Sequence, residues 1–356
     1  MGDKLNERED IPIEKNFYEE LNDNLSGKTS PFVYYKDMAY TINKAKESSL
    51  ANIRMMCRNG LLTELHYSIM RALYMYSYLN AYLIREALLV DGKESFNITP
   101  ITARKAIKTL VSRGLLLQYT FKHLDDYGNE QGSPYIYKLS ASGERMVQRE
   151  QGGMLKFWMP RKAVIDNKPF EIISVLKRLA INQFHITFMK QYKNRKYLHS
   201  SDYYIVEYQG GIFPAVYRIE LPSGQTILSM FLVSIRGNNG WRNEFLKDLR
   251  MVREFIDEKG ITGVGILVIC ETEYQAMEAA KYKACDSTVK SLEAFYTTDN
   301  TIVSSEDVLS QLIDVLPKNN FTSRRMFSLN FEEADYSKED EARMNELILE
   351  NTESEL

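Results

Sequence analysis

The residues best suited to chemistry lie in the stretch "TPITARKAIKTLVSRG", from Thr99 to Gly114. One set of its side chains offers cations and hydroxyl groups with no carboxylate beside them. The set consists of Thr102, Arg104, Lys105, Lys108, Thr109, Ser112 and Arg113. Phosphate oxygens and guanine edges favour such groups, and a helix N-terminus adds its own attraction for a phosphate. The pattern predicts a surface that contacts nucleic acid.

A single amphipathic helix would position these side chains. Thr99 suits the N-cap, Pro100 the first helical position, and Gly114 the left-handed residue after the end. The opposite face is an apolar stripe made of Ala103, Ile107, Leu110 and Val111. Such a stripe packs against a core, which would leave the cationic face outward.

The flanking segments predict a winged helix-turn-helix. Two helices that meet near residues 77–80 precede the basic helix, and a hairpin from Leu115–Lys122 to Tyr135–Leu139 follows it. In that fold the third helix enters the major groove. Lys122 and His123 would reach phosphate from the wing, although the wing also contains acidic residues. The alternative is that the basic face is only solvated, or that the unit binds protein.

Five tyrosines in the two preceding helices have two interpretations. They are Tyr67, Tyr74, Tyr76, Tyr78 and Tyr82. Tyrosine offers apolar area with a polar tip, so a stripe of it suits either a partly buried core or a homodimer interface. The core interpretation is favoured.

The second half predicts an α/β sheet, since strands alternate with helices from Tyr203 onward. The order is typical of restriction-endonuclease-like cores, in which two acids hold a divalent cation. Asp202 and Glu220 are the two acids to consider. The position of the usual Glu-x-Lys reads Ser234-Ile235-Arg236, so a hard cation would bind weakly. We therefore expect no catalytic residue, no metal and no cofactor, with Mg²⁺ needed only if the domain is a nuclease.

Without cleavage, the second domain would serve for contact with DNA or protein. Three of its cations are then candidate phosphate contacts: Arg236, Arg242 and Lys247.

The arrangement resembles the replication-relaxation family of bacterial plasmids and integrative or conjugative elements. The matching segments include "ARKAIKTLVSRGLL", "SPYIYKLSASGER", "FLVSIRGNNG" and "GILVICETEYQAMEAA", and the similarity covers roughly residues 60–305. Where the family shows Glu-Val-Asp-Arg-Gly, this chain has Val233-Ser234-Ile235-Arg236-Gly237, without either acid. The resemblance implies binding near an origin of replication or transfer, in support of an initiator or relaxase.

The totals bound these expectations. The 356 residues carry a formal net charge of −3, so a nucleic-acid surface must be local. The polar start predicts no signal peptide, and no apolar run approaches the length of a membrane span, which predicts a cytoplasmic protein. We expect a flexible 1–30, a helical lead-in and winged helix in 31–150, a linker at 151–169, a nuclease-like domain in 170–320 and an acidic tail at 321–356.

The expected function is a DNA-binding accessory protein of a plasmid or mobile element. Its partners would be double-stranded DNA, a relaxase or replication initiator, and a second copy of the chain. Two alternatives stay open at this point. One is a metal-dependent nuclease that uses Asp202 and Glu220, and the other is a dimeric winged-helix transcriptional regulator.

Overall fold

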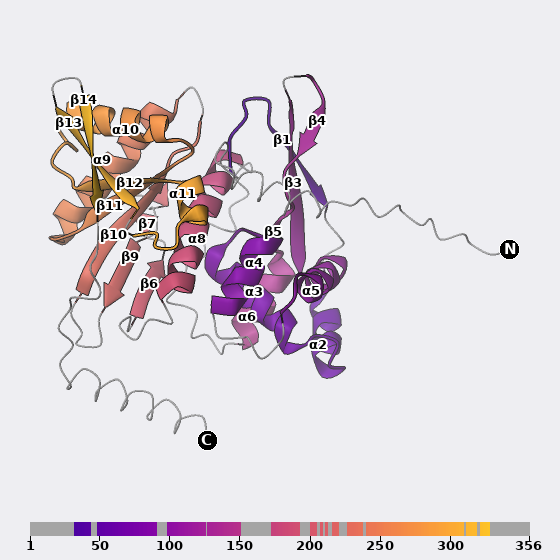
Figure 1. The fold of residues 1–356 in the computed structure, drawn as a ribbon. Coiled ribbons are helices and arrows are strands. Elements are labelled where there is room, and N and C mark those ends of the chain that lie inside the picture. The colour runs from indigo at the N-terminus through magenta and orange to yellow at the C-terminus, as the bar shows by residue number, and fades with distance from the viewer. Residues whose placement is uncertain are drawn as a thin grey trace.

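The protein is a mixed α/β molecule in which one long helix, α8, joins two layered parts (Figure 1). The computed structural model describes residues 32–43, 48–90, 98–125, 127–150, 172–192, 200–204, 207–208, 211–212, 216–220, 226–237, 240–309, 311–318 and 321–327. The expectations of a flexible 1–30 and of a linker at 151–169 concern residues outside these ranges.

The first part combines helices with a small antiparallel sheet. Its elements are β1 (Ala39–Asn43), α2 (Leu50–Arg58), α3 (Glu64–Tyr76), β2 (Leu79–Asn80), α4 (Ala81–Val90), α5 (Pro100–Ser112), β3 (Leu116–Leu124), β4 (Glu130–Gly132), β5 (Ile136–Leu139) and α6 (Ala141–Glu150). The strands lie in the order β1-β3-β5-β2, and β4 pairs with the far end of β3. The break between α3 and α4 falls at residues 77–80, as the sequence predicted.

The lead-in differs from the helical stretch that the sequence suggested. Its first element is the strand β1, which pairs antiparallel with β3 from Ala39↔Lys122 to Asn43↔Gln118. A helix, α2, follows only at Leu50. The strand forms because β3 offers an unpaired edge, and such an edge is a template for a further strand.

The second part is built on a seven-stranded sheet. Its elements are β6 (Ser200–Tyr204), β9 (Val216–Glu220), β10 (Thr226–Ser234), α9 (Trp241–Lys259), β11 (Gly265–Cys270), α10 (Glu273–Cys285), β12 (Ala294–Thr298), α11 (Asp299–Ser304), β13 (Leu312–Lys318) and β14 (Phe321–Phe327), with a separate small pair of β7 (Glu207–Tyr208) and β8 (Gly211–Ile212). The strand order is β14-β13-β12-β11-β10-β9-β6. The central strands β10, β11 and β12 are parallel, and the outer ones antiparallel.

The sheet extends beyond its last parallel strand, β12. The hairpin β13–β14 follows it, so residues 321–327 belong to the sheet rather than to the tail. Among the described helices, none combines the length and apolar character that a bilayer crossing would need.

The two faces of this sheet are covered by different helices. Leu232, Leu267 and Phe295 belong to one core cluster, which also contains the buried side chains of α8. Their neighbours along the strands, such as Val233 and Val268, belong to a second cluster with α9 and α10. The division follows from the strand period of two, which sends successive side chains to opposite faces.

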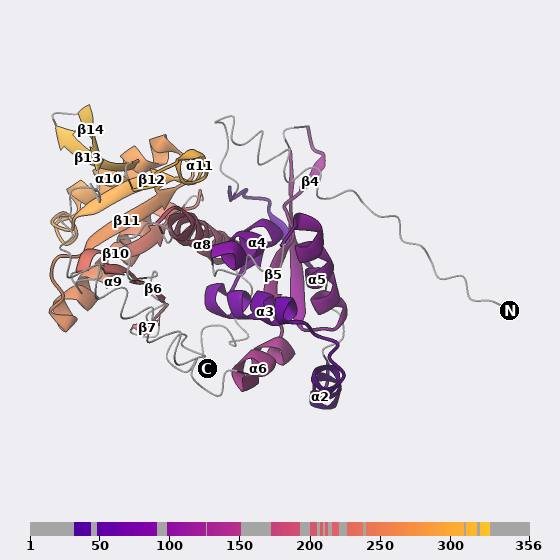
Figure 2. The same ribbon diagram turned by 60° about the horizontal axis from the view of Figure 1, so that its bottom comes forward.

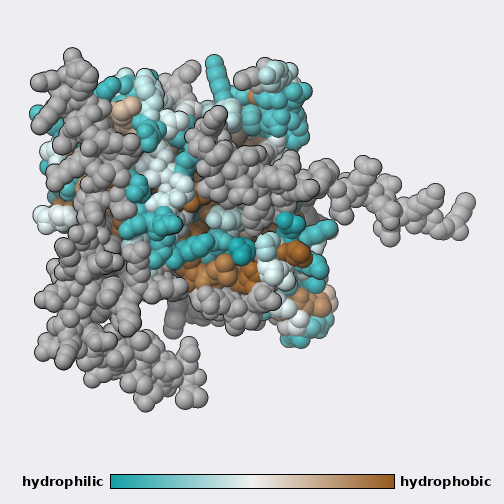
Figure 3. All heavy atoms as spheres, viewed as in Figure 1, coloured by the Kyte–Doolittle hydropathy of each residue, from teal (hydrophilic) through white to brown (hydrophobic). Residues whose placement is uncertain are grey.

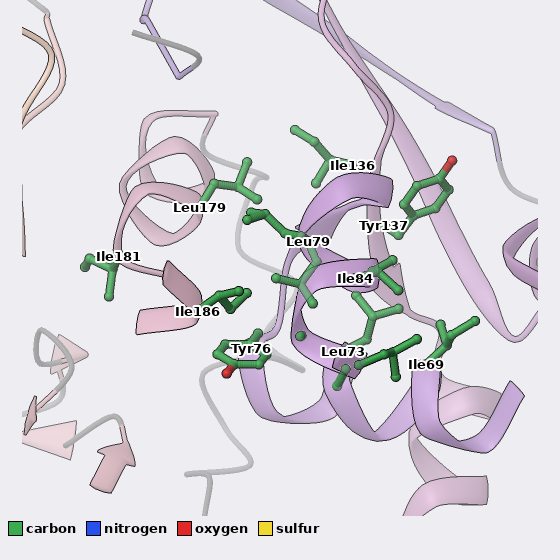
Figure 4. Close-up of a cluster of buried hydrophobic side chains, with 14 of the residues drawn as sticks. Ile69, Leu73, Tyr76, Leu79, Ile84, Ile136, Tyr137, Leu179, Ile181 and Ile186 are labelled. Carbon is green, nitrogen blue, oxygen red and sulfur yellow. The ribbon is translucent and has the colours of Figure 1, made fainter. Parts of the chain in front are cut away.

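Helix α8 (Ile172–Tyr192) is buried on most of its circumference because it has protein on both sides. It packs against α4 of the first part and β10 of the second. Figure 4 shows Leu179 and Ile186 of α8 beside Leu79 and Tyr76, and Ile181 on the opposite side of α8. The core of the first part therefore continues into the sheet of the second.

A polar contact fixes this junction. The Tyr76 hydroxyl and Nδ1 of His185 are 2.9 Å apart. The Asn182 amide donates to the carbonyls of Tyr76 (2.9 Å) and Tyr78 (2.8 Å), which lie at the end of α3. Ser77, between these two carbonyls, has a φ of 67°, a conformation that few L residues adopt.

The burial of His185 makes the folded state sensitive to acid. Burial lowers the pKa of His185 to about 3. Below the unfolded pKa of about 6.5 the unfolded chain takes up a proton that the folded chain refuses, so stability falls as the pH drops. We expect this histidine to remove about 2 kcal/mol of unfolding free energy between pH 7 and pH 5. Urea denaturation of the wild type and of His185→Gln at both pH values checks this, because the variant should lack that share of the loss. Parallel pH dependence in the two proteins would contradict it.

Candidate nucleic-acid interface

Helix α5 begins and ends where its local sequence dictates. The Thr99 hydroxyl accepts a hydrogen bond from the amide of Thr102 at 3.1 Å, and Pro100 is the first helical residue. Gly114 has a φ of +66°, as expected for the left-handed residue that ends a helix. The predicted capping is confirmed.

The two faces of α5 separate as the sequence predicted. Ala103, Ala106, Ile107, Leu110 and Val111 are buried. On the other side Thr102, Arg104, Lys105, Lys108 and Ser112 are exposed, Thr109 and Arg113 are half-buried, and Ile101 is 60% exposed. We call this outward set, from Ile101 to Arg113, the basic face.

Two cations of the basic face, Lys105 and Lys108, have no acid paired with them among the residues that the structure describes. Arg104 lies near Tyr137 of β5: burial raises the pKa of Tyr137, and the Arg104 charge opposes that rise. Two flexible ammonium groups therefore stand in solvent with their charge available to a polyanion.

The hydroxyl groups of the basic face have a narrower role than the sequence suggested. Thr102 donates to the carbonyl of Thr99, Thr109 to that of Lys105 and Ser112 to that of Thr109, each at 2.9 Å. A phosphate only accepts hydrogen bonds, so it would have to displace these contacts. The same hydroxyl oxygens can still accept from base amino groups.

The hairpin β3–β4 lies beyond one end of α5. A tight turn at Arg113–Leu115 joins α5 to β3, and the two elements are in contact; in Figure 2 the β4 end of the hairpin lies above α5. At 1.5 Å per residue, α5 spans about 20 Å, whereas the nine residues of β3 span about 30 Å. β3 therefore reaches further from the shared turn than α5 does, and its far end carries β4.

The two wing residues predicted to touch phosphate already have partners within the protein. Lys122 forms an ion pair with Glu130, and the His123 ring stacks on Tyr35 at 3.8 Å with an angle of 2° between planes. A phosphate would have to compete with both contacts. Contact of Lys122 and His123 with phosphate stays a prediction, and α5 is the stronger part of the interface.

The described part of the hairpin turn contains an acid, Asp125, that accepts several hydrogen bonds. The Asp125 carboxylate accepts hydrogen bonds from the amides of Tyr127 (3.0 Å) and Asn129 (2.8 Å) and from the Asn129 and Gln131 side chains. These hydrogen bonds, chiefly that from the Asn129 amide, lower the pKa of Asp125, so the group is charged at neutral pH. Next to it the Tyr127 ring is 90% exposed.

Arg236 is not on the surface, which corrects the expectation that it contacts phosphate. Its side chain is 0% exposed, and it makes two hydrogen bonds to Asp299, at 2.6 and 2.9 Å. The two residues follow the ends of the parallel strands β10 and β12, where the register brings them together. A fully buried guanidinium with a matched carboxylate is a structural ion pair.

The other two candidate phosphate contacts of the second part, Arg242 and Lys247, are partly accessible. Arg242 lies 5.0 Å from the ring centres of both Trp241 and Tyr282 and 4.0 Å from Glu278. Lys247 is exposed on α9. They lie on the helix that covers the second sheet, and no described contact links them to α5.

Sequence reasoning missed two acids at the ends of the parallel strands, Glu271 and Asp299. Glu271 accepts a hydrogen bond from the amide of Tyr34 at 3.0 Å, and burial raises its pKa. A Cβ added at Gly237 would lie 2.8 Å from a Glu271 oxygen, so a glycine fits there. The signal was present, since each acid directly follows or closes a buried apolar strand.

The two acids of the nuclease alternative lie on neighbouring strands. The backbone register places Asp202 opposite Arg218 and Glu220 opposite Ser200, so that the two acids occupy diagonal positions. Their side chains are outside the described part of the molecule. Among the side chains that are described, no group of three or more His, Cys, Asp or Glu could hold a metal ion.

Comparisons with protein-family models, with curated proteins and with solved structures gave no significant match to this chain. The resemblance to the replication-relaxation family therefore stays a prediction.

Proposed function

We propose that this chain binds double-stranded DNA through α5, the recognition helix of a winged helix-turn-helix. The observation that carries the proposal is the basic face, where Lys105 and Lys108 stand in solvent without an ion pair among the described residues. Phosphates are the polyanionic ligand for which such a helix face is suited. One exposed lysine needs no explanation beyond its solvation. A helix face that carries several cations and no acid among residues 101–113 favours an anionic ligand.

The arrangement around α5 supports this fold assignment. A short strand between the first two helices, β2, pairs with β5, and β5 pairs with β3. That order, with α5 against β3 and a hairpin at the far end of β3, fits a winged helix in which α5 enters a major groove.

The resemblance stated above would make the DNA an origin of replication or transfer on a plasmid or mobile element. The protein would then act in the cytoplasm beside an initiator or relaxase. A homodimer fits palindromic sites, but the tyrosines of α3 and α4 are half-buried or buried in the core, which supports their core role. Figure 3 shows an apolar area over α3, which is where a protein partner of that unit would find apolar surface.

A mobility-shift titration tests the proposal, with fragments of the element that encodes the protein. The variant Lys105→Ala, Lys108→Ala should bind about 10- to 100-fold more weakly near 0.1 M salt, since it loses two phosphate contacts. The slope of log affinity against log salt should fall by about 2. The control Lys259→Ala, Lys290→Ala removes the same charge from exposed sites in the second part. Equal affinities of the two variants would refute the assignment to α5.

The same titration with Mg²⁺ addresses the nuclease alternative, which the diagonal placement of Asp202 and Glu220 keeps open. Cleavage that requires Mg²⁺ and disappears in Asp202→Ala, while binding persists, would favour the nuclease. Intact DNA in every lane favours a binding protein.

A further inference from the structure

The negative charge of this chain is concentrated at its C-terminal end. Within the tail expected at 321–356, residues 331–356 contain ten acidic and two basic residues, for a formal charge of −8, and this shorter segment is called the acidic tail from here on. Because the whole chain carries −3, the remaining residues carry +5. The tail therefore turns a basic protein into a mildly acidic one.

The basic face of α5 offers a complementary surface. It presents Lys105 and Lys108 without an ion pair among the described residues, together with Ile101, which is 60% exposed. The acidic tail combines its carboxylates with a short apolar run at residues 347–349. The basic face and the acidic tail are therefore complementary in charge, and each also has an apolar side chain beside its charges.

The sheet topology brings the start of the tail to a favourable edge. The last residue of β14, Phe327, pairs with Leu312, at the start of β13. Since β13 runs antiparallel to β12, this point lies at the edge where the parallel strands end. Glu271 at that edge accepts the hydrogen bond from Tyr34, whose segment leads into β1 and the hairpin beside α5.

The tail is long enough for the remaining distance. The 29 residues after Phe327 span at most about 100 Å when fully extended. A folded domain of about 300 residues has a radius of gyration of only about 19 Å. No point on the surface is out of reach.

We propose that the acidic tail binds the basic face of α5 and competes there with DNA. The inference rests on the proposed function, since it describes regulation of that same surface. The tethered tail acts at an effective concentration in the millimolar range, which suffices to displace weakly held, non-specific DNA. A specific site adds base contacts that the tail cannot copy, and so it displaces the tail. The tail thereby raises discrimination between specific and non-specific DNA.

The contact itself is tested without DNA. Zero-length carbodiimide cross-linking of the full chain should join carboxylates of the tail to Lys105 and Lys108, but not to the exposed Lys259 and Lys290. Acetylation footprinting should show Lys105 and Lys108 becoming several-fold more reactive when the chain is truncated after Asn330, with Lys259 and Lys290 unchanged. No cross-link to α5 and unchanged reactivity would overturn the proposal.

The competition is tested with a non-specific duplex and two variants of equal charge. Glu339→Gln, Asp340→Asn, Glu341→Gln neutralises three acids of the tail, and Glu254→Gln, Asp257→Asn, Glu258→Gln neutralises three exposed acids of α9. We expect the tail variant to bind non-specific DNA roughly three- to tenfold more tightly near 0.1 M salt, and the α9 variant to change little. Equal gains would reduce the effect to net charge and overturn the proposal. A different outcome separates the two proposals. If the tail cross-links to α5 but the truncated chain binds no DNA, the proposed DNA-binding function is wrong and the contact of the tail with α5 stands.

Discussion

Replacement of Asp299 by asparagine is expected to lower the free energy of unfolding by about 3–5 kcal/mol. The change removes the carboxylate that matches Arg236 across two hydrogen bonds, and both side chains are 0% exposed. A guanidinium does not lose its proton at accessible pH, so Arg236 would be left as an uncompensated charge in the core. Urea denaturation followed by circular dichroism measures the loss.

A double variant separates the charge from the packing. Arg236→Met with Asp299→Leu removes both charges, and replacing a buried ion pair by apolar residues is often nearly neutral. We expect the double variant to be more stable than Asp299→Asn. Lys247→Ala, an exposed change on α9, should stay within about 0.5 kcal/mol of the wild type. A small loss for Asp299→Asn would show that Arg236 reaches water, and the surface role first assigned to it would return.

Replacement of Asn182 by leucine is expected to lower the free energy of unfolding by about 2–4 kcal/mol. The Asn182 amide is the donor to two carbonyls, those of Tyr76 and Tyr78, and its side chain is fully buried. Leucine has a similar volume but leaves both acceptors without that partner, at about 1–3 kcal/mol each. Tyr76 is the last residue of α3 and Tyr78 follows it, whereas Asn182 lies on α8. Loss of the two hydrogen bonds should therefore also weaken the junction of the two parts.

The same denaturation series provides the check on this junction. Thr187→Ala, a change at a half-buried position of the same helix, should cost much less than Asn182→Leu. A transition that splits in two for Asn182→Leu would show that the two parts unfold separately once the contact is lost. An unchanged midpoint would contradict the structural role of Asn182.

The basic face of α5 comes from a single short stretch, and that explains why the sequence predicted the helix ends and the exposed side correctly. Every charged member lies between Arg104 and Arg113, and the helix period alone sorts them to one side. The sequence could not show that Thr102, Thr109 and Ser112 donate to the helix backbone, since a hydroxyl in a helix has either option. It also could not show that Lys122 has Glu130 as a neighbour, because that contact requires the hairpin to close.

The sequence by itself determined the features that depend on neighbours a few residues apart. The ends of α5 follow from Thr99, Pro100 and Gly114, and the buried strand β11 from its unbroken apolar run. Capping, helical period and strand alternation depend on residues a few positions apart, so they can be predicted from the sequence alone.

Only the tertiary structure decided the features that join distant segments. Arg236 meets an acid 63 residues further on, β1 finds its partner in β3, and α8 is enclosed between two parts of the molecule. An arginine after a buried strand is equally consistent with a phosphate contact and with a structural ion pair. Its burial depends on which side chains the parallel register brings to it, and that register is set by packing across the whole sheet.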